Sequence, residues 1–426
     1  MRMTAGLSGR LLAGMLASSV VLLAWGVATT SADAGREPGP RPKPKPTATA
    51  SPSPTPSPSP TPGPSCGFAV VSSPNASSGD NILSDVAVLS ASDAWAVGEY
   101  TPDGSGAVRT LIQHYDGTDW TIVPSPNRLQ GVGRNQINTL LGVTAIGPSD
   151  VWAVGYTVSL DAPYQTLTMH WNGTAWSIVD SPNYTFPGAY NTLLDVSATG
   201  PDDVWAVGGS ALGGGSGRGL LLHFDGTAWS LRAGPPNAEF WASSARNGVV
   251  ALSPSDVWAV GDYDAWHFDG TAWTVPAAGA QFTNDADATG PGTVWAVGSF
   301  IANPYSGGTR YPIGHHFTGT SWQQHHAADL QPGAFNGVTV RAADDVIAVG
   351  YSGQFTYALH WNGTTWQRLA AGNPNPSPNP NLAIANVLLS VANADGTAWA
   401  VGYYYNGTSS GDQSGVQRTL IERYTC

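Results

Sequence analysis

Basic side chains are scarce in this sequence. The chain has 426 residues, and from Cys66 to Cys426 it holds eleven arginines and no lysine against twenty-seven acidic residues, a formal net charge of −16. Proteins that bind nucleic acids or anionic membrane surfaces need clustered cationic side chains to contact phosphates. We therefore expect no nucleic-acid partner and no membrane contact by this part of the chain.

Recognisable catalytic and cofactor motifs are missing too. No phosphate-binding loop, HExxH, GxSxG or CxxC pattern occurs, so the sequence predicts no catalytic residue, no metal ligand set and no cofactor. A sialidase-like site would need several converging arginines and a catalytic glutamate, yet residues 66–426 contain only three glutamates, Glu99, Glu239 and Glu422. A non-enzymatic protein is favoured, and an enzymatic one stays open.

The chain is instead rich in a repeated segment of about fifty residues. Trp-Ala-Val-Gly occurs six times, and Ile347-Ala-Val-Gly is a seventh, altered copy. Six of the copies are followed by a His-aromatic-x-Gly-Thr-x-Trp segment, as in His170–Trp176. Self-similarity at such a period indicates a repeat architecture. The six copies begin at Trp95, Trp152, Trp205, Trp258, Trp295 and Trp399.

One repeat predicts four short strands. In the second copy these are residues 140–145, 151–154, 166–171 and 175–179, and Asn172-Gly173 between the last two matches a type I′ hairpin. A four-stranded antiparallel meander has two apolar faces and no core of its own, so it must stack on its copies. The sequence therefore predicts an all-β fold, a seven-bladed β-propeller of four-stranded antiparallel blades.

The last repeat lacks its fourth strand, and the missing segment lies at the other end. Residues 66–75 resemble the fourth-strand segments that begin near Trp120 and Trp176. Joining Cys426 to Cys66 restores the repeat spacing, so we expect an N-terminal strand to complete the last blade. The chain's only two cysteines then meet at the break, and in an exported chain they are expected to form a disulfide.

The two repeated tryptophan positions are predicted to be buried between blades, with Ile347 and Phe68 filling them in the exceptions. This predicted core contains Trp95, Trp120, Trp152, Trp176, Trp205, Trp229, Trp258, Trp273, Trp295, Trp322, Trp366 and Trp399.

Several polar residues also recur at fixed repeat positions, which indicates a structural role in each blade. The aspartates before the second strand are interpreted as turn residues whose side chains bond turn amides. The recurring histidines are His114, His170, His223, His267, His316 and His360, and the aspartates are Asp150, Asp203, Asp256 and Asp345.

A further repeat position, directly before the valine of the first strand, is expected to line the central channel of the propeller. Carboxylates there could bond amides of the neighbouring blade, or they could hold a cation or a file of water. The residues are Asp85, Gly142, Asp195, Gly248, Asp285, Gly337 and Ser390.

The N-terminus has the pattern of an exported protein. Residues 1–34 have arginines, an apolar stretch and a small-residue cleavage site, as expected of a signal peptide. An uncleaved membrane anchor is the alternative. Residues 35–65 are rich in Pro, Ser and Thr, as in a disordered, extended linker, and residues 66–426 form the propeller. We expect a secreted or cell-surface protein.

Ligands are expected on one face of the propeller. The loops joining second to third strands and those joining blade to blade share a face, called here the loop-rich face, and are long and variable, for example residues 156–166. In the fourth repeat the loop shortens to residues 262–264, which predicts a notch. Either the aromatics beside this notch bind a sugar, or they plug the gap. The predicted ligand-binding residues are Glu239, Phe240, Trp241, Arg246, Asp262, Tyr263 and Asp264.

From its Asp-Val-Trp-Ala-Val-Gly and His-Trp-Asn-Gly-Thr-x-Trp repeats, the chain resembles secreted bacterial β-propeller proteins, and more loosely kelch, tectonin and Asp-box propellers. The resemblance implies a propeller outside the cell but no particular activity. Three functions remain open: a binding module for a glycan or an extracellular protein, a glycan-active hydrolase or lyase, and a structural protein without a specific ligand. We expect a monomer.

Overall fold

The computed structural model describes residues 66–102, 106–129, 136–159, 162–186, 189–211, 217–235, 246–261, 264–276, 282–302, 308–327, 331–375, 385–407 and 415–426. These residues form seven four-stranded antiparallel sheets and no helix. Within them, therefore, no helix is long and apolar enough to cross a membrane. The expected signal peptide and linker, residues 1–65, lie outside the described residues.

Each sheet is one blade of a meander, and the blades are numbered here in chain order. Blade 1 consists of β2 (Asn81–Ser90), β3 (Asp93–Tyr100), β4 (Arg109–Tyr115) and β5 (Trp120–Ile122). Blade 2 consists of β6 (Ile137–Gly147), β7 (Asp150–Ser159), β8 (Ala162–Trp171) and β9 (Trp176–Val179). Blade 3 consists of β10 (Tyr190–Gly200), β11 (Asp203–Ala211), β12 (Gly217–Phe224) and β13 (Trp229–Leu231). Blade 4 consists of β14 (Arg246–Ser253), β15 (Asp256–Gly261), β16 (Ala265–Phe268) and β17 (Trp273–Thr274). Blade 5 consists of β18 (Thr283–Ala288), β19 (Val294–Ile301), β20 (Arg310–Phe317) and β21 (Trp322–His326). Blade 6 consists of β22 (Gly333–Ala342), β23 (Asp345–Ser352), β24 (Phe355–Trp361) and β25 (Trp366–Arg368). Blade 7 consists of β26 (Asn386–Ala394), β27 (Thr397–Tyr405), β28 (Gln417–Thr425) and β1 (Gly67–Val71).

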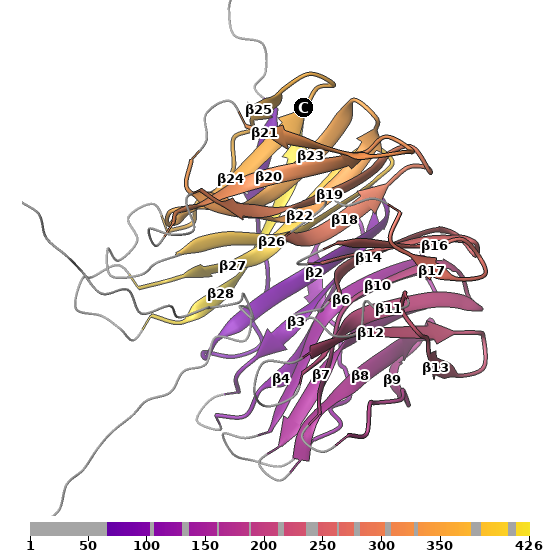
Figure 1. The fold of residues 1–426 in the computed structure, drawn as a ribbon. Helices are drawn as coiled ribbons and strands as arrows, with labels where there is room; N and C mark the ends of the chain where they lie inside the picture. Colours follow the sequence, from indigo (N-terminus) through magenta and orange to yellow (C-terminus); the bar gives the residue numbers. More distant parts are fainter. Residues whose placement is uncertain are drawn as a thin grey trace, which may run out of the picture. The chain divides into compact units, whose positions relative to one another are not determined.

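The blades form a closed ring. The first strand of each blade contacts the first strand of the next, and β26 of blade 7 returns to β2 of blade 1 (Figure 1). The prediction of a seven-bladed propeller is thereby confirmed.

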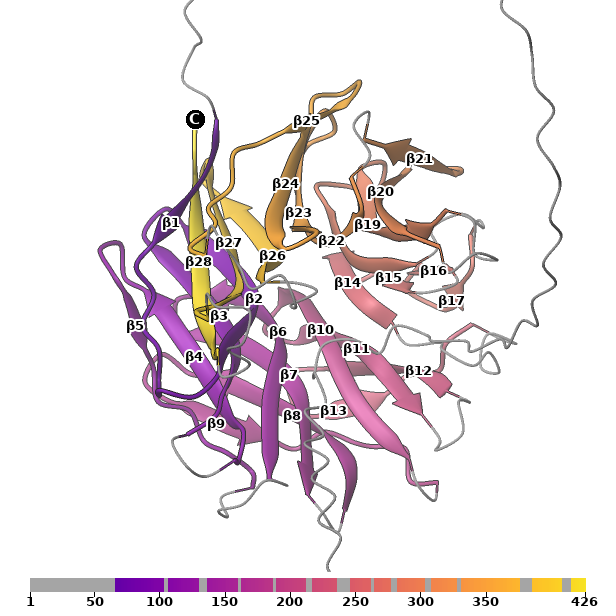
Figure 2. The same cartoon turned by 90° about the vertical axis from the view of Figure 1, so that its left-hand side faces the viewer.

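The ring closes through the N-terminal strand. β1 pairs with β28, with Phe68 opposite Tyr424, just as Trp120 lies opposite Tyr115 in blade 1. Figure 2 shows β1 alongside β28 and the C-terminus beside it. Cys66 and Cys426 form the predicted disulfide, with a Cα–Cα separation of 4.2 Å.

Neighbouring blades are joined by pairs of indole rings. The tryptophan of each second strand meets the fourth-strand tryptophan of the next blade edge to face, as Trp152 meets Trp229 at a centroid distance of 5.3 Å. All twelve repeat tryptophans are buried, as predicted. The seventh interface holds the two exceptions together, because Ile347 of blade 6 and Phe68 of blade 7 share one core cluster. The other five pairs are Trp95–Trp176, Trp205–Trp273, Trp258–Trp322, Trp295–Trp366 and Trp399–Trp120.

The glycine of Trp-Ala-Val-Gly has a steric cause. The register of β6 against β7 shifts between Leu140 and Gly142, which brings the bent first strand close to the second. A Cβ on Gly155 would lie 2.0 Å from the carbonyl oxygen of Thr139. Any larger residue would therefore push the two strands apart.

The predicted type I′ hairpin is wrong. Trp171 pairs with Trp176, so the loop has four residues, 172–175. Within it Gly173 has a positive φ of 90°, whereas Asn172 is not among the described non-glycine residues with positive φ. Instead, the Asn172 side chain accepts the amides of Thr174 and Ala175, both at 3.0 Å, which stabilises a turn of the Asx type.

The predicted loop at residues 156–166 is also mostly wrong. β7 runs to Ser159 and β8 begins at Ala162, so only residues 160 and 161 lie between them. Tyr156-Thr-Val158 has the aromatic and β-branched side chains that favour strands, and it extends the ladder beyond the repeat.

We expect Trp152→Ala to lower the free energy of unfolding by roughly 3–5 kcal/mol, because the change removes a buried indole and leaves a cavity. Denaturant unfolding measures the loss, and Val275→Ala, on an exposed side chain, should change it by less than about 0.5 kcal/mol. A double-mutant cycle with Trp229→Ala should give a coupling of about 0.5–1.5 kcal/mol. A coupling near zero would contradict the pairing of these rings.

Replacing both Cys66 and Cys426 by serine should lower stability by at most about 6 kcal/mol, because the bond closes a loop of nearly the whole propeller. Peptide mapping of the wild-type protein without reduction should recover the two cysteines in one linked species. Two free thiols in folded, exported protein would refute the closure of the last blade.

Candidate functional site

The repeated aspartates and histidines bond each other. Trp152 lies opposite His170 in the β7–β8 ladder, and Asp150 is two residues earlier on the same side of β7. His170 Nε2 therefore lies 2.8 Å from Asp150 Oδ1, while its ring packs on Trp152 at 4.5 Å. The prediction that these aspartates bond turn amides is wrong, although their role is structural. The equivalent pairs are Asp93–His114, Asp203–His223, Asp256–His267 and Asp345–His360.

The centre of the ring is a cavity of about 200 Å³ lined by carboxylates. Three of these aspartates directly precede the first-strand valine or alanine of blades 1, 3 and 5. The Oδ1 atom of each accepts a hydrogen bond from the backbone amide of the next residue, and its Oδ2 atom accepts one from a backbone amide of the following blade. The prediction that they bond neighbouring-blade amides is confirmed. The bonds between blades are Asp85 to Val143 at 2.6 Å, Asp195 to Val249 at 2.7 Å and Asp285 to Val338 at 2.9 Å.

Blades 2, 4 and 6 have glycine at the same position, because there the backbones touch. A Cβ on Gly142 would lie 2.8 Å from the Asp195 Cα, and one on Gly337 would lie 2.7 Å from the Ser390 Cα. Blade 7 has Ser390 at this position. Its hydroxyl donates a hydrogen bond to Asp85 Oδ1 of blade 1 at 2.5 Å, which closes the ring of seven blades at the channel.

The channel carboxyls hold their protons more tightly than ordinary aspartates. Burial raises the pKa of Asp85 to about 6, and burial together with the charge of Asp85 raises the pKa of Asp195 to about 8. Burial and the charge of Asp195 likewise hold the pKa of Asp285 well above its usual range. Within the described residues, no group of three or more His, Cys, Asp or Glu is placed to hold a metal ion.

The predicted notch in blade 4 is only partly within the described residues. Glu239, Phe240, Trp241, Asp262 and Tyr263 lie outside them, as does the side chain of Arg246. β15 ends at Gly261 and β16 begins at Ala265, so the short loop is present. Asp264 is half-buried. The ligand-binding role of these residues stays a prediction.

Among the described residues, three exposed aromatic side chains lie on the loop-rich face. Tyr190 begins the first strand of blade 3, Phe282 directly precedes that of blade 5, and Phe355 begins the third strand of blade 6. All of these positions are strand ends on the loop-rich face, and the side chains are 42%, 42% and 41% exposed. Phe282 also has a positive φ of 56°, an uncommon conformation for a bulky residue.

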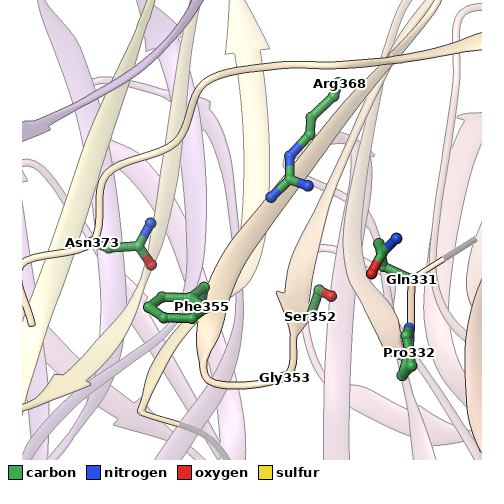
Figure 3. A pocket seen from close by; sticks show the side chains of 7 residues that line it. All are labelled: Gln331, Pro332, Ser352, Gly353, Phe355, Arg368 and Asn373. Carbon is green, nitrogen blue, oxygen red and sulfur yellow. The ribbon is translucent and has the colours of Figure 1, made fainter. Parts of the chain in front are cut away.

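A pocket of about 420 Å³ opens beside Phe355 (Figure 3). β23 ends at Ser352 and β24 begins at Phe355, so the turn between them has only two residues, including Gly353 with a φ of 57°. Sequence reasoning missed this site, although the short turn that predicted a notch in blade 4 recurs here. The pocket is lined by Gln331, Pro332, Ser352, Gly353, Phe355, Arg368 and Asn373.

Glu99, at the end of β3 that meets the loop-rich face, is an acidic group with a perturbed pKa. It accepts a hydrogen bond from the Thr139 hydroxyl, and burial raises its pKa to about 7, with a further contribution from Asp80. Beside it, Tyr156 packs on Tyr164 at 5.1 Å, and Tyr164 contacts the exposed Tyr190 at the same distance.

No protein-family model matches the sequence, and no curated protein matches it. Among solved structures, the fold is similar to YCF48 bound to D1 peptide (13% identity, 84% of this chain and 95% of that chain, TM-score 0.48). It is also similar to the phage phi92 endosialidase (9% identity, 84% and 69%, TM-score 0.48) and to the six-bladed lectin of Aleuria aurantia (12% identity, 80% and 95%, TM-score 0.38). Similarities of this size carry no inference about ligand or activity.

The channel predicts how stability depends on pH. Because the folded-state pKa values of Asp85 and Asp195 are raised to about 6 and about 8, the folded protein binds more protons than the unfolded chain between about pH 4 and pH 8. Stability should therefore fall as pH rises through this window, and the urea midpoint should be higher at pH 5 than at pH 8.

Asp195→Asn should reduce that difference, because it removes one of the titrating groups. Asp225→Asn is a matched control: this hairpin carboxyl is exposed, its pKa is lowered by backbone hydrogen bonds, and two other blades have asparagine there. The control should leave the pH difference unchanged. A stability that rises from pH 5 to pH 8 would contradict the raised pKa values.

Proposed function

We propose that this protein is an extracellular, non-enzymatic binding module that recognises a glycan or a surface protein through the loop-rich face of its propeller. The observation that carries the proposal is the placing of Tyr190, Phe282 and Phe355, each more than two-fifths exposed, on that face. Exposed aromatic rings cost free energy in water, and they are the side chains that binding surfaces favour.

The other exposed large apolar side chains differ in kind and position. They are aliphatic and lie on or just after the outer strands: Val70 on β1, Ile122 on β5, Leu231 on β13 and Val275 just after β17. Single aliphatic residues of this sort are ordinary on protein surfaces. The aromatic residues of the loop-rich face therefore distinguish it from the rim.

A glycan suits this surface because sugar rings present apolar C–H faces to aromatic rings and hydroxyl groups to polar side chains. The predicted signal peptide and Pro-rich linker support export and display away from a surface, and the disulfide supports an oxidising compartment.

A glycan-active hydrolase is the second candidate, and Glu99 is the observation that favours it. A carboxyl whose pKa is raised to about 7 by burial is about half protonated at neutral pH, so a large share of it could serve as a general acid. It would need a second carboxylate within about 10 Å of it across a bound substrate.

The secreted protein should bind members of a glycan array or a panel of extracellular proteins, and the bound glycans should remain intact on prolonged incubation. Replacing Tyr190, Phe282 and Phe355 together by alanine should abolish binding, while the melting temperature stays nearly unchanged because these rings are exposed. Replacing Val70, Ile122 and Val275 instead is the matched control and should leave binding intact.

Other outcomes assign the function differently. Cleavage of bound glycans that stops in Glu99→Gln, with binding retained, would favour the hydrolase. Binding that survives the aromatic variant but is lost in a Glu239→Ala, Trp241→Ala variant would place the site in the predicted notch of blade 4. No binding to any glycan or protein would refute the proposal.

A further inference from the structure

The pocket of blade 6 differs from the rest of the surface in shape. Its volume of about 420 Å³ falls in the range of small-ligand sites. The turn at residues 353–354 is short, and the lining residues come from this turn, from the entry to blade 6 and from the residues at and after the end of its last strand. Phe355 stands at its edge, exposed rather than packed into the blade.

The pocket also contains a cation without an acidic partner. Arg368 is exposed, and its guanidinium packs over the ring of the buried Tyr357 at 5.2 Å. Within the described part of the chain no carboxylate pairs with it, unlike Arg128 and Arg341, which pair with Asp180 and Asp345. Figure 3 shows the guanidinium turned toward the space between Phe355 and Gln331.

This cation lies in a domain with a formal net charge of −16. A second arginine, Arg310, lies close enough to Tyr351 to lower its pKa, against the larger effect of burial, and Tyr351 directly precedes the lining residue Ser352. Glu422 is fully buried behind Gly372, whose amide it accepts at 3.0 Å, and it does not line the pocket. Arg368 is thus the one charged side chain among the lining residues, and it gives the pocket lining a positive charge on an acidic protein.

Neutral polar groups complete the lining. Gln331 and Ser352 contribute an amide and a hydroxyl, and Asn373 contributes an amide whose oxygen accepts the backbone amide of Thr356 at 2.9 Å. The Asn373 NH2 group donates one hydrogen to the Ala371 carbonyl at 3.3 Å, which leaves its second hydrogen able to donate. A ring to stack on, a guanidinium for an anion and amides for hydroxyls are together complementary to one kind of ligand.

We propose that the blade 6 pocket binds a sugar residue that carries a carboxylate, such as a hexuronic acid. Arg368 pairs with the carboxylate, Phe355 packs against the C–H face of the sugar ring, and Gln331 and Asn373 bond its hydroxyls. This inference rests on the proposed glycan-binding function and adds the class of sugar and its position.

Calorimetric titration of the secreted protein with oligomers of glucuronic acid and of galacturonic acid, each beside its carboxyl-reduced neutral counterpart, tests the proposal. At least one acidic oligomer should bind more tightly than its neutral counterpart. Arg368→Gln should weaken that binding roughly ten- to hundred-fold, the value of a charge-assisted bond, and should leave binding of the neutral oligomer unchanged. Phe355→Ala should weaken both.

Two further variants exclude trivial causes. Arg368→Lys keeps the charge but loses the planar guanidinium, which packs over Tyr357 and can pair with a carboxylate through two nitrogens, so an intermediate loss is expected. Arg128→Gln removes one positive charge from the same face outside the pocket and should leave binding unchanged. Melting temperatures of all variants show whether any loss comes from unfolding.

The outcomes separate this inference from the function on which it rests. If glycans bind, but no acidic oligomer binds more tightly than its neutral counterpart, or if Arg368→Gln binds the acidic oligomer like the wild type, the inference is wrong and the binding function stands. If no glycan or protein binds at all, both are wrong.

Discussion

The contact on which this structure depends is the edge-to-face pair of indole rings between blades. Each blade is a sheet with two apolar faces, so none can bury its own residues, and each interface must be filled by the same two positions of adjacent repeats. At the one interface without tryptophans, both members of the pair change together, to Ile347 and Phe68. That joint change shows that the interface, rather than the individual blade, is the unit of packing. It also explains why the last blade must recruit its fourth strand from the N-terminus.

The centre of the ring follows from the same stacking. Seven first strands converge there, and Asp alternates with Gly from blade to blade. Each aspartate bonds a backbone amide of the next blade, and each glycine lets its backbone contact that of the blade after it. Because seven is odd, the alternation cannot repeat perfectly, and Ser390 bonds Asp85 where it breaks. The acids in the channel are thus part of the architecture. Their hydrogen bonds are already made, which leaves the faces of the disc for recognition.

On the loop-rich face, the residues on which the proposed function rests depart from the repeat. The repeat itself supplies buried rings and paired charges, as in the Asp150–His170 contact. Phe355 and Arg368 are exposed, and they stand beside a turn shorter than its neighbours. The residues that line the pocket all belong to blade 6 and its flanking connections. In the proposed function, a ligand contacts these residues rather than the buried rings between blades.

The sequence by itself determined the number of blades, the strand that closes the ring, the disulfide and the buried tryptophans, because each is encoded by a local pattern repeated along the chain. It did not determine the partners of the polar side chains. The predicted hairpin type at Asn172 and the predicted bonding partner of Asp150 are both wrong, because a side chain bonds the group that the fold brings within reach. For Asp150 that group is His170 on the neighbouring strand. The pocket at Phe355 was missed for a related reason. Its lining residues come from the entry to blade 6, from the turn at Ser352 and Gly353 and from the residues at and after the end of the last strand, and only the tertiary structure brings them together.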